Sequence, residues 1–153
     1  MQLTPDIVRH VEGQVMIIAA VRRGDGAAIA RSAGSRVTPD GEVELYISRQ
    51  WVNAVEAAAP GGLIAATFTA PADYRSYQIK GRIVSVTPVA ADSGPAAYVD
   101  DMLTVMAGLG VTLEPLSHTF PLGGLICVRF RPDSLFLQTP GPRAGSAVTD
   151  VEA

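Results

Sequence analysis

The segment from Thr67 to Val86, TFTAPADYRSYQIKGRIVSV, constrains the fold more than any other part of the chain, because it reads as two strands joined by a short loop. In the second strand polar residues alternate with apolar ones, which is the period of a strand with one buried face. The polar positions are Ser76, Gln78, Lys80 and Arg82, and the apolar positions are Tyr77, Ile79 and Ile83. After Gly81 the phase reverses, since Val84 and Val86 occupy positions that were polar. A glycine at such a phase change predicts a bulge or a close approach of another backbone.

The other predicted elements are mostly consecutive strands, with helices inserted between them at irregular intervals. We expect helices after Thr4, from Ser48 to about Ala59, and from about Ala96 to Leu109. Residues 92–95 are expected to open the last of these helices, and its methionines to fill core space. The run VMIIAAV at 15–21 is continuously apolar and predicts a strand buried on both faces. Because the strands are consecutive, an antiparallel barrel with peripheral helices is favoured over a doubly wound parallel sheet. Further strands are expected over residues 27–32, 42–48, 63–69, 124–130 and 134–137, of which the last two form a pair or one bent strand.

The composition indicates a single folded domain. The chain has 153 residues, 48% hydrophobic and 18% charged, which is enough for a core and unlike a disordered chain. A net charge of −3 argues against a general nucleic-acid binder. No apolar run is as long as a membrane span and the N-terminus lacks the pattern of a signal peptide, so we expect a cytoplasmic protein without a membrane partner. We expect the domain to cover residues 1–137 and residues 138–153 to form a Pro/Gly-rich tail whose start is docked near Phe136.

Common catalytic motifs are absent from the sequence. It contains no GxGxxG, no Walker loop, no HExxH and no Ser-His-Asp constellation. Two histidines far apart do not have the spacing of metal ligands, so His10 is expected to be a surface or packing residue and no metal site is predicted. Cys127, the single cysteine, lies among apolar residues of a strand and is expected to be buried and unreactive.

Basic and hydroxyl residues gather instead near predicted strand ends. Guanidinium groups pair bidentately with phosphate oxygens and hydroxyls add further donors, so this set suits a phosphate. The segment from Arg31 to Arg36 is expected to be a flexible connection, and Ser48 and Arg49 are expected at a helix N-terminus, where free N–H groups favour an anion. The set consists of Arg31, Ser32, Ser35, Arg36, Ser48, Arg49, Gln78 and Lys80.

The order of elements and motifs resembles the FMN-binding split barrel of the pyridoxamine 5′-phosphate oxidase-like superfamily. The resemblance covers about Val11 to Val89 and, more loosely, the last strand with its QTPGPRAG tail at 138–145. It includes the GDG turn at 24–26, a strand ending in Arg, and YRSYQIKG at 74–81. It implies an antiparallel split β-barrel of Greek-key type. It also implies a cofactor site that includes Arg31 and a second basic residue, Arg36, five positions later. The other implied cofactor contacts are Tyr46 with Ile47, Ser48 with Arg49, and Ser76 or Gln78.

This resemblance implies a homodimer that binds FMN at the subunit interface and transfers hydride or electrons to a small molecule. Arg31, Arg36 and Arg49 are expected to neutralise the phosphate, and Gln78 or Lys80 to contact the ring. The 153 residues show no counterpart of the oxidase family's substrate-binding C-terminal extension, so we do not expect pyridoxamine phosphate to be the substrate. The alternative is a non-enzymatic split barrel that acts as a ligand-binding or sensory module with haem, a deazaflavin or no cofactor. A weaker possibility is a structural dimer whose polar strand face is only the rim of its interface.

Overall fold

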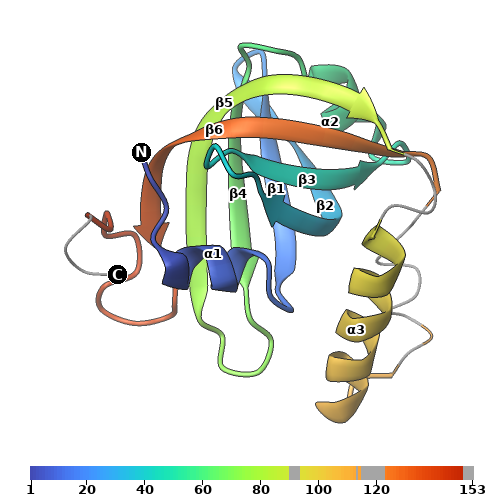
Figure 1. The fold of residues 1–153 in the computed structure, drawn as a ribbon, viewed down its shortest axis with the longest axis vertical. Coiled ribbons are helices and arrows are strands. Elements are labelled where there is room, and N and C mark those ends of the chain that lie inside the picture. Colours follow the sequence, from blue (N-terminus) through green and yellow to red (C-terminus); the bar gives the residue numbers. More distant parts are fainter. Residues whose placement is uncertain (90–93, 113, 115–122, 150–153) are drawn as a thin grey trace.

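Six antiparallel strands form a closed barrel in the order β1-β2-β3-β6-β5-β4 (Figure 1). The computed structural model describes residues 1–89, 94–112, 114 and 123–149. This architecture confirms the predicted mostly β, antiparallel barrel with peripheral helices. The elements are α1 (Pro5–Val11), β1 (Met16–Arg23), β2 (Gly26–Val37), β3 (Val43–Ser48), α2 (Val52–Ala57), β4 (Leu63–Thr69), β5 (Ser76–Pro88), α3 (Pro95–Gly108) and β6 (Leu125–Leu137).

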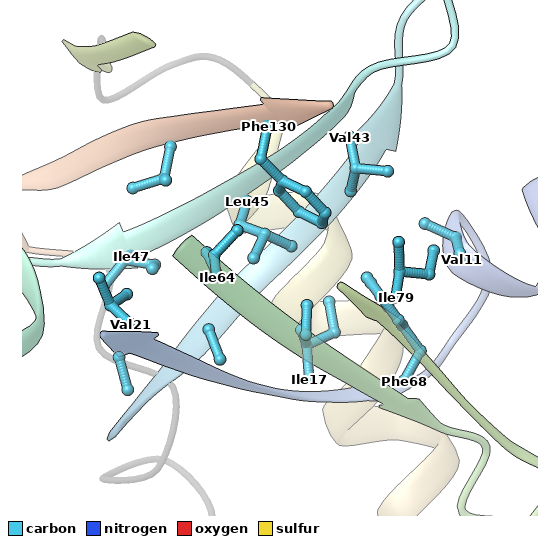
Figure 2. Close-up of a cluster of buried hydrophobic side chains, with 14 of the residues drawn as sticks. Val11, Ile17, Val21, Val43, Leu45, Ile47, Ile64, Phe68, Ile79 and Phe130 are labelled. Carbon is cyan, nitrogen blue, oxygen red and sulfur yellow. The ribbon is translucent and has the colours of Figure 1, made fainter. Parts of the chain in front are cut away.

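The core fills the barrel with side chains from alternate positions of every strand. Figure 2 shows Phe68, Ile79 and Phe130 pointing into one cluster with residues of the other strands. Small residues, such as Ala19 and Ala66, are also fully buried in this cluster. Because interiors are packed as densely as organic crystals, small side chains on some strands make room for the aromatic rings of others. α1 closes one end of the barrel by adding Val11 to the same cluster.

The phase change predicted after Gly81 is present, and both predicted causes occur: a close backbone approach at Gly81 and a bulge at Val84. A Cβ at Gly81 would overlap the carbonyl oxygen of Arg131 and lie 2.8 Å from the ring of Phe130, which confirms the predicted close backbone approach. The extra residue within β5 is Val84, because Ile83 pairs with Phe130 and Ser85 with Arg129. This bulge turns the following valine, Val86, toward the core.

Three sequence predictions need correction. β1 is buried on one face only: its outward side chains include Ile18, which is 43% exposed, because no helix covers this part of the barrel in the chain described. β2 continues to Val37, so residues 31–36 are not a flexible connection but part of a strand with a register shift between Ser32 and Ser35. α2 begins at Val52 and has six residues, because Ser48 is still paired in β3.

The last strand is one bent strand, the second of the two predicted alternatives. β6 runs from Leu125 to Leu137 and has an extra residue, Asp133, opposite the junction of Lys80 and Gly81. After β6 the chain folds back along its own strand: the amide of Val148 donates to Leu135 O (2.9 Å) and Phe136 forms a bridge with Ala147. The expected tail is therefore docked on the barrel at least to this point.

α3 lies beside the barrel and away from α2 (Figure 1). It packs Val99, Met102 and Met106 against Ala33 of β2 and Leu125 of β6, and these form a second, smaller buried cluster. The methionines thus fill core space, as the sequence suggested. The predicted opening of this helix at 92–93 lies outside the described residues, and its observed start is Pro95. No helix within the described residues is long and apolar enough to cross a bilayer.

Candidate cofactor site beside the third helix

A cavity of about 570 Å³ lies where the end of α1, β2, β3 and the start of α3 meet. We call it the α3 cavity. Its volume is within the range of small-molecule sites, roughly 300–1,000 Å³. Three of the residues predicted from the sequence, Ser35, Arg36 and Tyr46, lie together here. The complete lining is Glu12, Gly34, Ser35, Arg36, Tyr46, Gly94, Pro95 and Tyr98.

The irregularity in β2 builds this cavity. Ser32 pairs with Ile47 and Ser35 with Leu45, so β2 has one more residue than β3 over this stretch. The Ser32 hydroxyl stabilises the bulge: it accepts the amide of Tyr46 (2.9 Å) and lies 2.6 Å from its acceptor Gly34 O. In a regular strand, residues five apart point to opposite faces. The extra residue shifts this alternation by one position, so both Arg31 and Arg36 point outward from the barrel.

Two tyrosine rings and a bare backbone form the wall of the α3 cavity. A Cβ at Gly34 would lie 3.3 Å from the Tyr98 ring and 3.4 Å from the Tyr46 ring, so a larger residue would displace one of them. The Tyr98 hydroxyl donates to Val15 O and anchors α3 to the start of β1. Burial raises the pKa of Tyr98. Burial, followed by the charge of Glu44, raises the pKa of Tyr46 to about 12. Both phenols are therefore protonated at neutral pH and act as walls and donors.

The Arg36 guanidinium keeps its charge unpaired in this cavity. Its cross-strand neighbour is Glu44, which is 8% exposed. One oxygen of Glu44 accepts both Nε (3.1 Å) and Nη2 (2.7 Å) of Arg129, and the other accepts the Tyr46 hydroxyl (3.3 Å). The Glu12 carboxylate accepts the amide of Val37 (2.9 Å) and makes no ion pair with Arg36. Within the described chain, Arg36 has neither an ion pair nor a side-chain hydrogen bond, and such a guanidinium is suited to an anion from outside.

Of the eight other arginines, five have acidic partners, Arg22 and Arg82 donate only to backbone carbonyls, and Arg143 has no side-chain partner within the described residues. Acidic partners satisfy Arg9, Arg23, Arg75, Arg129 and Arg131, which pair with Asp6, Glu56, Asp73, Glu44 and Glu42. Among the residues that the structure describes, Arg31, Arg36 and Arg49 have no such partner. The three arginines predicted to neutralise a phosphate therefore all have free guanidinium groups.

Ser48 and Arg49 lie at the end of β3, next to the start of β6. The Ser48 hydroxyl donates to Gly123 O (2.9 Å) and the Arg49 amide to Gly124 O (3.1 Å). Because α2 starts later and is only six residues long, the predicted helix-terminus anion site is wrong. The Arg49 side chain lies over Gly124, where a Cβ would be 3.4 Å from its Cδ. Its contact with a phosphate stays a prediction.

A second group of predicted residues lies on another surface, formed by the outward side chains of β2, β1, β4 and β5. One row across these strands contains Arg31, Ile18, Thr67 and Gln78, and the next contains Ile29, Ala20, Ala65 and Lys80. We call these two rows the outer sheet face. Gln78 donates from Nε2 to Thr67 Oγ1 (3.1 Å), and Lys80 Nζ lies 4.4 Å from the centre of the Phe136 ring. None of these side chains lines the α3 cavity.

The remaining predicted residues point into the protein. Ile47 is in the barrel core, and the Ser32 hydroxyl is used within the bulge. Ser76 is buried, with its hydroxyl 2.7 Å from Thr69 Oγ1 and its amide donating to Thr139 Oγ1 (2.9 Å) in the tail. Their roles as cofactor contacts stay predictions. The sequence analysis did not predict that Gly34, Tyr98 and Glu12 line the α3 cavity. A glycine within a polar run was the one available signal for Gly34. No local pattern in the sequence predicts that α1 or α3 lies next to β2.

Cys127 and His10 are placed as expected from the sequence. Cys127 is buried and its pKa is raised to about 11, first by burial and then by the charge of Glu44, so the thiol stays protonated. His10 is 8% exposed, with Nε2 3.0 Å from Phe68 O and its ring edge-on to Tyr77 at 5.0 Å. Burial lowers the pKa of His10. Within the described residues, no three His, Cys, Asp or Glu side chains gather in a way that could hold a metal ion.

Comparison with known proteins supports the fold alone. The sequence matches no family model and no curated protein. HupZ from Group A Streptococcus superposes with a TM-score of 0.53 and 13% identity, over 94% of this chain and 100% of its own. An F420 reductase superposes with a TM-score of 0.54 and 15% identity, over 86% of this chain and 98% of its own. These neighbours have the split-barrel fold that the sequence predicted, and at such identities the likeness extends no further.

Proposed function

We propose that this protein is a cytoplasmic, homodimeric flavoprotein of the pyridoxamine 5′-phosphate oxidase-like superfamily that binds FMN and transfers hydride or electrons to a small molecule. The observation that carries the proposal is the free Arg36 guanidinium in the α3 cavity, beside Ser35 and Tyr46. An unpaired cation at a cavity of this size suits the phosphate of a mononucleotide. The split-barrel neighbours support the fold that such a site needs.

The residues in the α3 cavity fit a phosphate group better than a metal ion. Arg36 would neutralise the phosphate, and the walls formed by Gly34, Tyr46 and Tyr98 would exclude water from one side of a bound molecule. The Tyr46 hydroxyl, held by Glu44, fixes the ring that borders the cavity. When FMN is bound, its isoalloxazine supplies the redox chemistry, so the protein needs to bind and orient but does not need a nucleophile.

The division of the predicted residues between two surfaces supports a dimer. Arg36 is in the α3 cavity, whereas Gln78 and Lys80 are on the outer sheet face. That face also exposes Ile18 and Ile29, at 43% and 54%, next to alanines of β1 and β4. Adjacent exposed apolar side chains on a sheet are typical of an interaction surface. A second copy seated on this face would bury them and bring one protomer's Gln78 toward a ligand held by the other's Arg36.

The alternative is a ligand-binding or sensory module without enzymatic activity. The fold neighbour named for F420 keeps a deazaflavin among the candidate ligands, and haem is the other candidate that the resemblance implies. The hydroxyls of Tyr46 and Tyr98 are compatible with this alternative, because they donate to the Glu44 carboxylate and to Val15 O within the protein. Neither hydroxyl is therefore free to donate to a ligand in this structure.

An absorption spectrum before and after addition of FMN and desalting tests the proposal. We expect the visible bands of bound flavin to be retained, and the sedimentation velocity of a dimer. Arg36→Ala is the informative variant, with Arg9→Ala as its control, because Arg9 is exposed and paired with Asp6 on α1. Retention of haem or a deazaflavin in place of FMN would support the alternative. A protein that retains none of the three ligands would refute the cofactor proposal.

A further inference from the structure

A row of charged side chains crosses the outside of the barrel next to the α3 cavity. It contains Arg36 of β2, Glu44 of β3 and Arg129 of β6, which are paired directly across neighbouring strands. Side chains opposite one another in antiparallel strands have Cβ atoms about 4.5–5.5 Å apart. Both arginines are therefore within reach of the same carboxylate, and the row carries two positive charges and one negative charge. We call it the Glu44 row.

Arg129 holds the Glu44 carboxylate in this structure. Oε1 of Glu44 accepts both Nε (3.1 Å) and Nη2 (2.7 Å) of Arg129, and Oε2 accepts the Tyr46 hydroxyl (3.3 Å). Glu44 is buried, and a buried carboxylate without a cation close by is strongly destabilising. Arg129 supplies that cation, so the surplus positive charge of the Glu44 row remains on Arg36, which lines the α3 cavity.

The neighbouring acid, Glu42, has an arginine on one side only. Its Oε1 accepts Nη2 of Arg131 (3.0 Å), two residues further along β6 than Arg129. On the other side its backbone partner is Thr38, whose amide donates to Glu42 O (2.8 Å) and whose Oγ1 accepts the Glu42 amide (3.1 Å). Each of these two acids thus has an arginine of β6, but Glu44 alone of the two also faces an arginine of β2.

We propose that Arg129 is a positioning residue for the α3 cavity: by holding the Glu44 carboxylate, it keeps Arg36 free to bind an anion. Without the charge of Arg129, the buried carboxylate would lose its cation, and Arg36, its other cross-strand neighbour, would replace it. Arg36 would then turn from the cavity to Glu44. Arg129 itself does not line the cavity. The effect on FMN affinity rests on the proposed function, but the exchange of partners does not.

The Nε–Hε signal of Arg36 in a nitrogen–proton correlation spectrum of the ligand-free protein tests the exchange of partners. Arg129→Gln removes the charge but keeps a donor for the buried carboxylate. We expect it to shift the Arg36 signal and to slow the exchange of Hε with water, because Arg36 enters a charge-assisted hydrogen bond. Addition of Glu44→Gln should return the signal to its wild-type position. Arg131→Gln is the matched control, because it removes an ion-paired arginine from the same strand without freeing the acid opposite Arg36.

FMN titration of the same variants tests the consequence for binding. We expect Arg129→Gln to weaken FMN binding at least about fivefold, equivalent to about 1 kcal/mol, and Arg131→Gln to change it by less than about twofold. The double variant Arg129→Gln/Glu44→Gln should bind FMN as the wild type does, because its Glu44 row again carries one surplus positive charge, on Arg36.

An Arg36 signal that stays in place in Arg129→Gln, or a loss of FMN affinity that Glu44→Gln does not restore, would overturn the inference. If Arg129→Gln does not fold, Glu44→Gln alone decides: a shift of the Arg36 signal larger than that in Arg131→Gln would show that Arg36 already pairs with Glu44. A protein whose Arg36 signal responds as expected but that retains no FMN keeps the exchange of partners and loses the proposed function. Equal FMN binding by the wild type and Arg129→Gln does the reverse.

Discussion

The α3 cavity and the outer sheet face lie along the same strand, β2. The cavity leaves a charged group without a partner, whereas the face leaves apolar side chains exposed. At the end of β2 the cavity holds a guanidinium, Arg36, whose neighbouring acid is already paired with Arg129. Nearer the middle of β2, the outer sheet face exposes Ile18 and Ile29 around Arg31. The first surface is suited to an anion and the second to an apolar partner. The bulge at Gly34 separates them, so one extra residue in one strand divides two surfaces of different chemistry.

The largest expected effect is a loss of folding stability on substitution of Gly81, in the barrel that underlies both surfaces. Gly81→Val would force a side chain into the carbonyl of Arg131 and the ring of Phe130, so β5 and β6 would have to separate. We expect a loss of about 3 kcal/mol or more of unfolding free energy, or roughly 6–12 °C in melting temperature. Thermal unfolding measures this. Gly108→Ala, in open space on α3, is the control, and a Gly81→Val protein that melts like wild type would show that the close approach is wrong.

The second-largest effect tests whether the outer sheet face, and not the α3 cavity, is the surface through which the protein self-associates. Ile18→Asp places a charge in the centre of the outer sheet face and should weaken the proposed dimer by at least about 2 kcal/mol, as expected for a central interface residue. Sedimentation equilibrium measures the dissociation constant. Leu109→Asp is a matched control, because Leu109 is similarly exposed but lies at the end of α3. If both variants associate as the wild type does, the outer sheet face is not the interface.

A comparison of the two arginines of β2 asks whether one ligand contacts both surfaces. Arg36→Ala should weaken FMN binding by roughly 1.5–3 kcal/mol, the usual cost of losing a hydrogen bond to a charged group. Arg31→Ala should approach this loss only if the bound cofactor extends to the outer sheet face, and its effect should then disappear in the monomeric Ile18→Asp background. FMN titration by fluorescence quenching gives both values. Unchanged affinity in both arginine variants would remove the phosphate assignment.

The smallest expected effect is a pH dependence of folding stability that comes from the buried His10 and not from either surface. Burial lowers the pKa of His10 below 6.5 in the folded protein. As the pH falls through about 6.5, the unfolded chain takes up a proton that the folded chain does not, so stability decreases with decreasing pH. The stabilisation is complete above pH 6.5 and is lost from there down toward the folded-state pKa. Melting curves at pH 7.5 and 5.5 should differ less for His10→Gln than for wild type, and equal differences would contradict this account.

Local patterns in the sequence predicted the antiparallel barrel and the approximate position of each strand. β4 has the predicted bounds, and β5 alternates as expected from Ile79 to Ile83, although its polar Ser76 is buried. β3 shows no such alternation in burial, because Glu44 and Ser48 are buried as well as the apolar residues. Errors occurred where a local signal competed with pairing. Ser48 resembles a helix cap, yet its ladder partner Leu125 keeps it in β3. The polar residues 31–36 were expected to be a connection, yet pairing with β3 keeps them in β2.

The sequence by itself determined which groups this protein has available: alternating strands for a closed barrel, a glycine where two strands approach closely, and basic and hydroxyl residues suited to a phosphate. Only the tertiary structure decided which of them meet. Alternation predicts a face but not a neighbour, and a single bulge reverses that face, so Arg31 and Arg36 could not be assigned to surfaces from their spacing. The cavity likewise depends on Glu12, Arg36 and Tyr98, which come from α1, β2 and α3. Packing between elements far apart in the chain brings them together, and no local pattern encodes that.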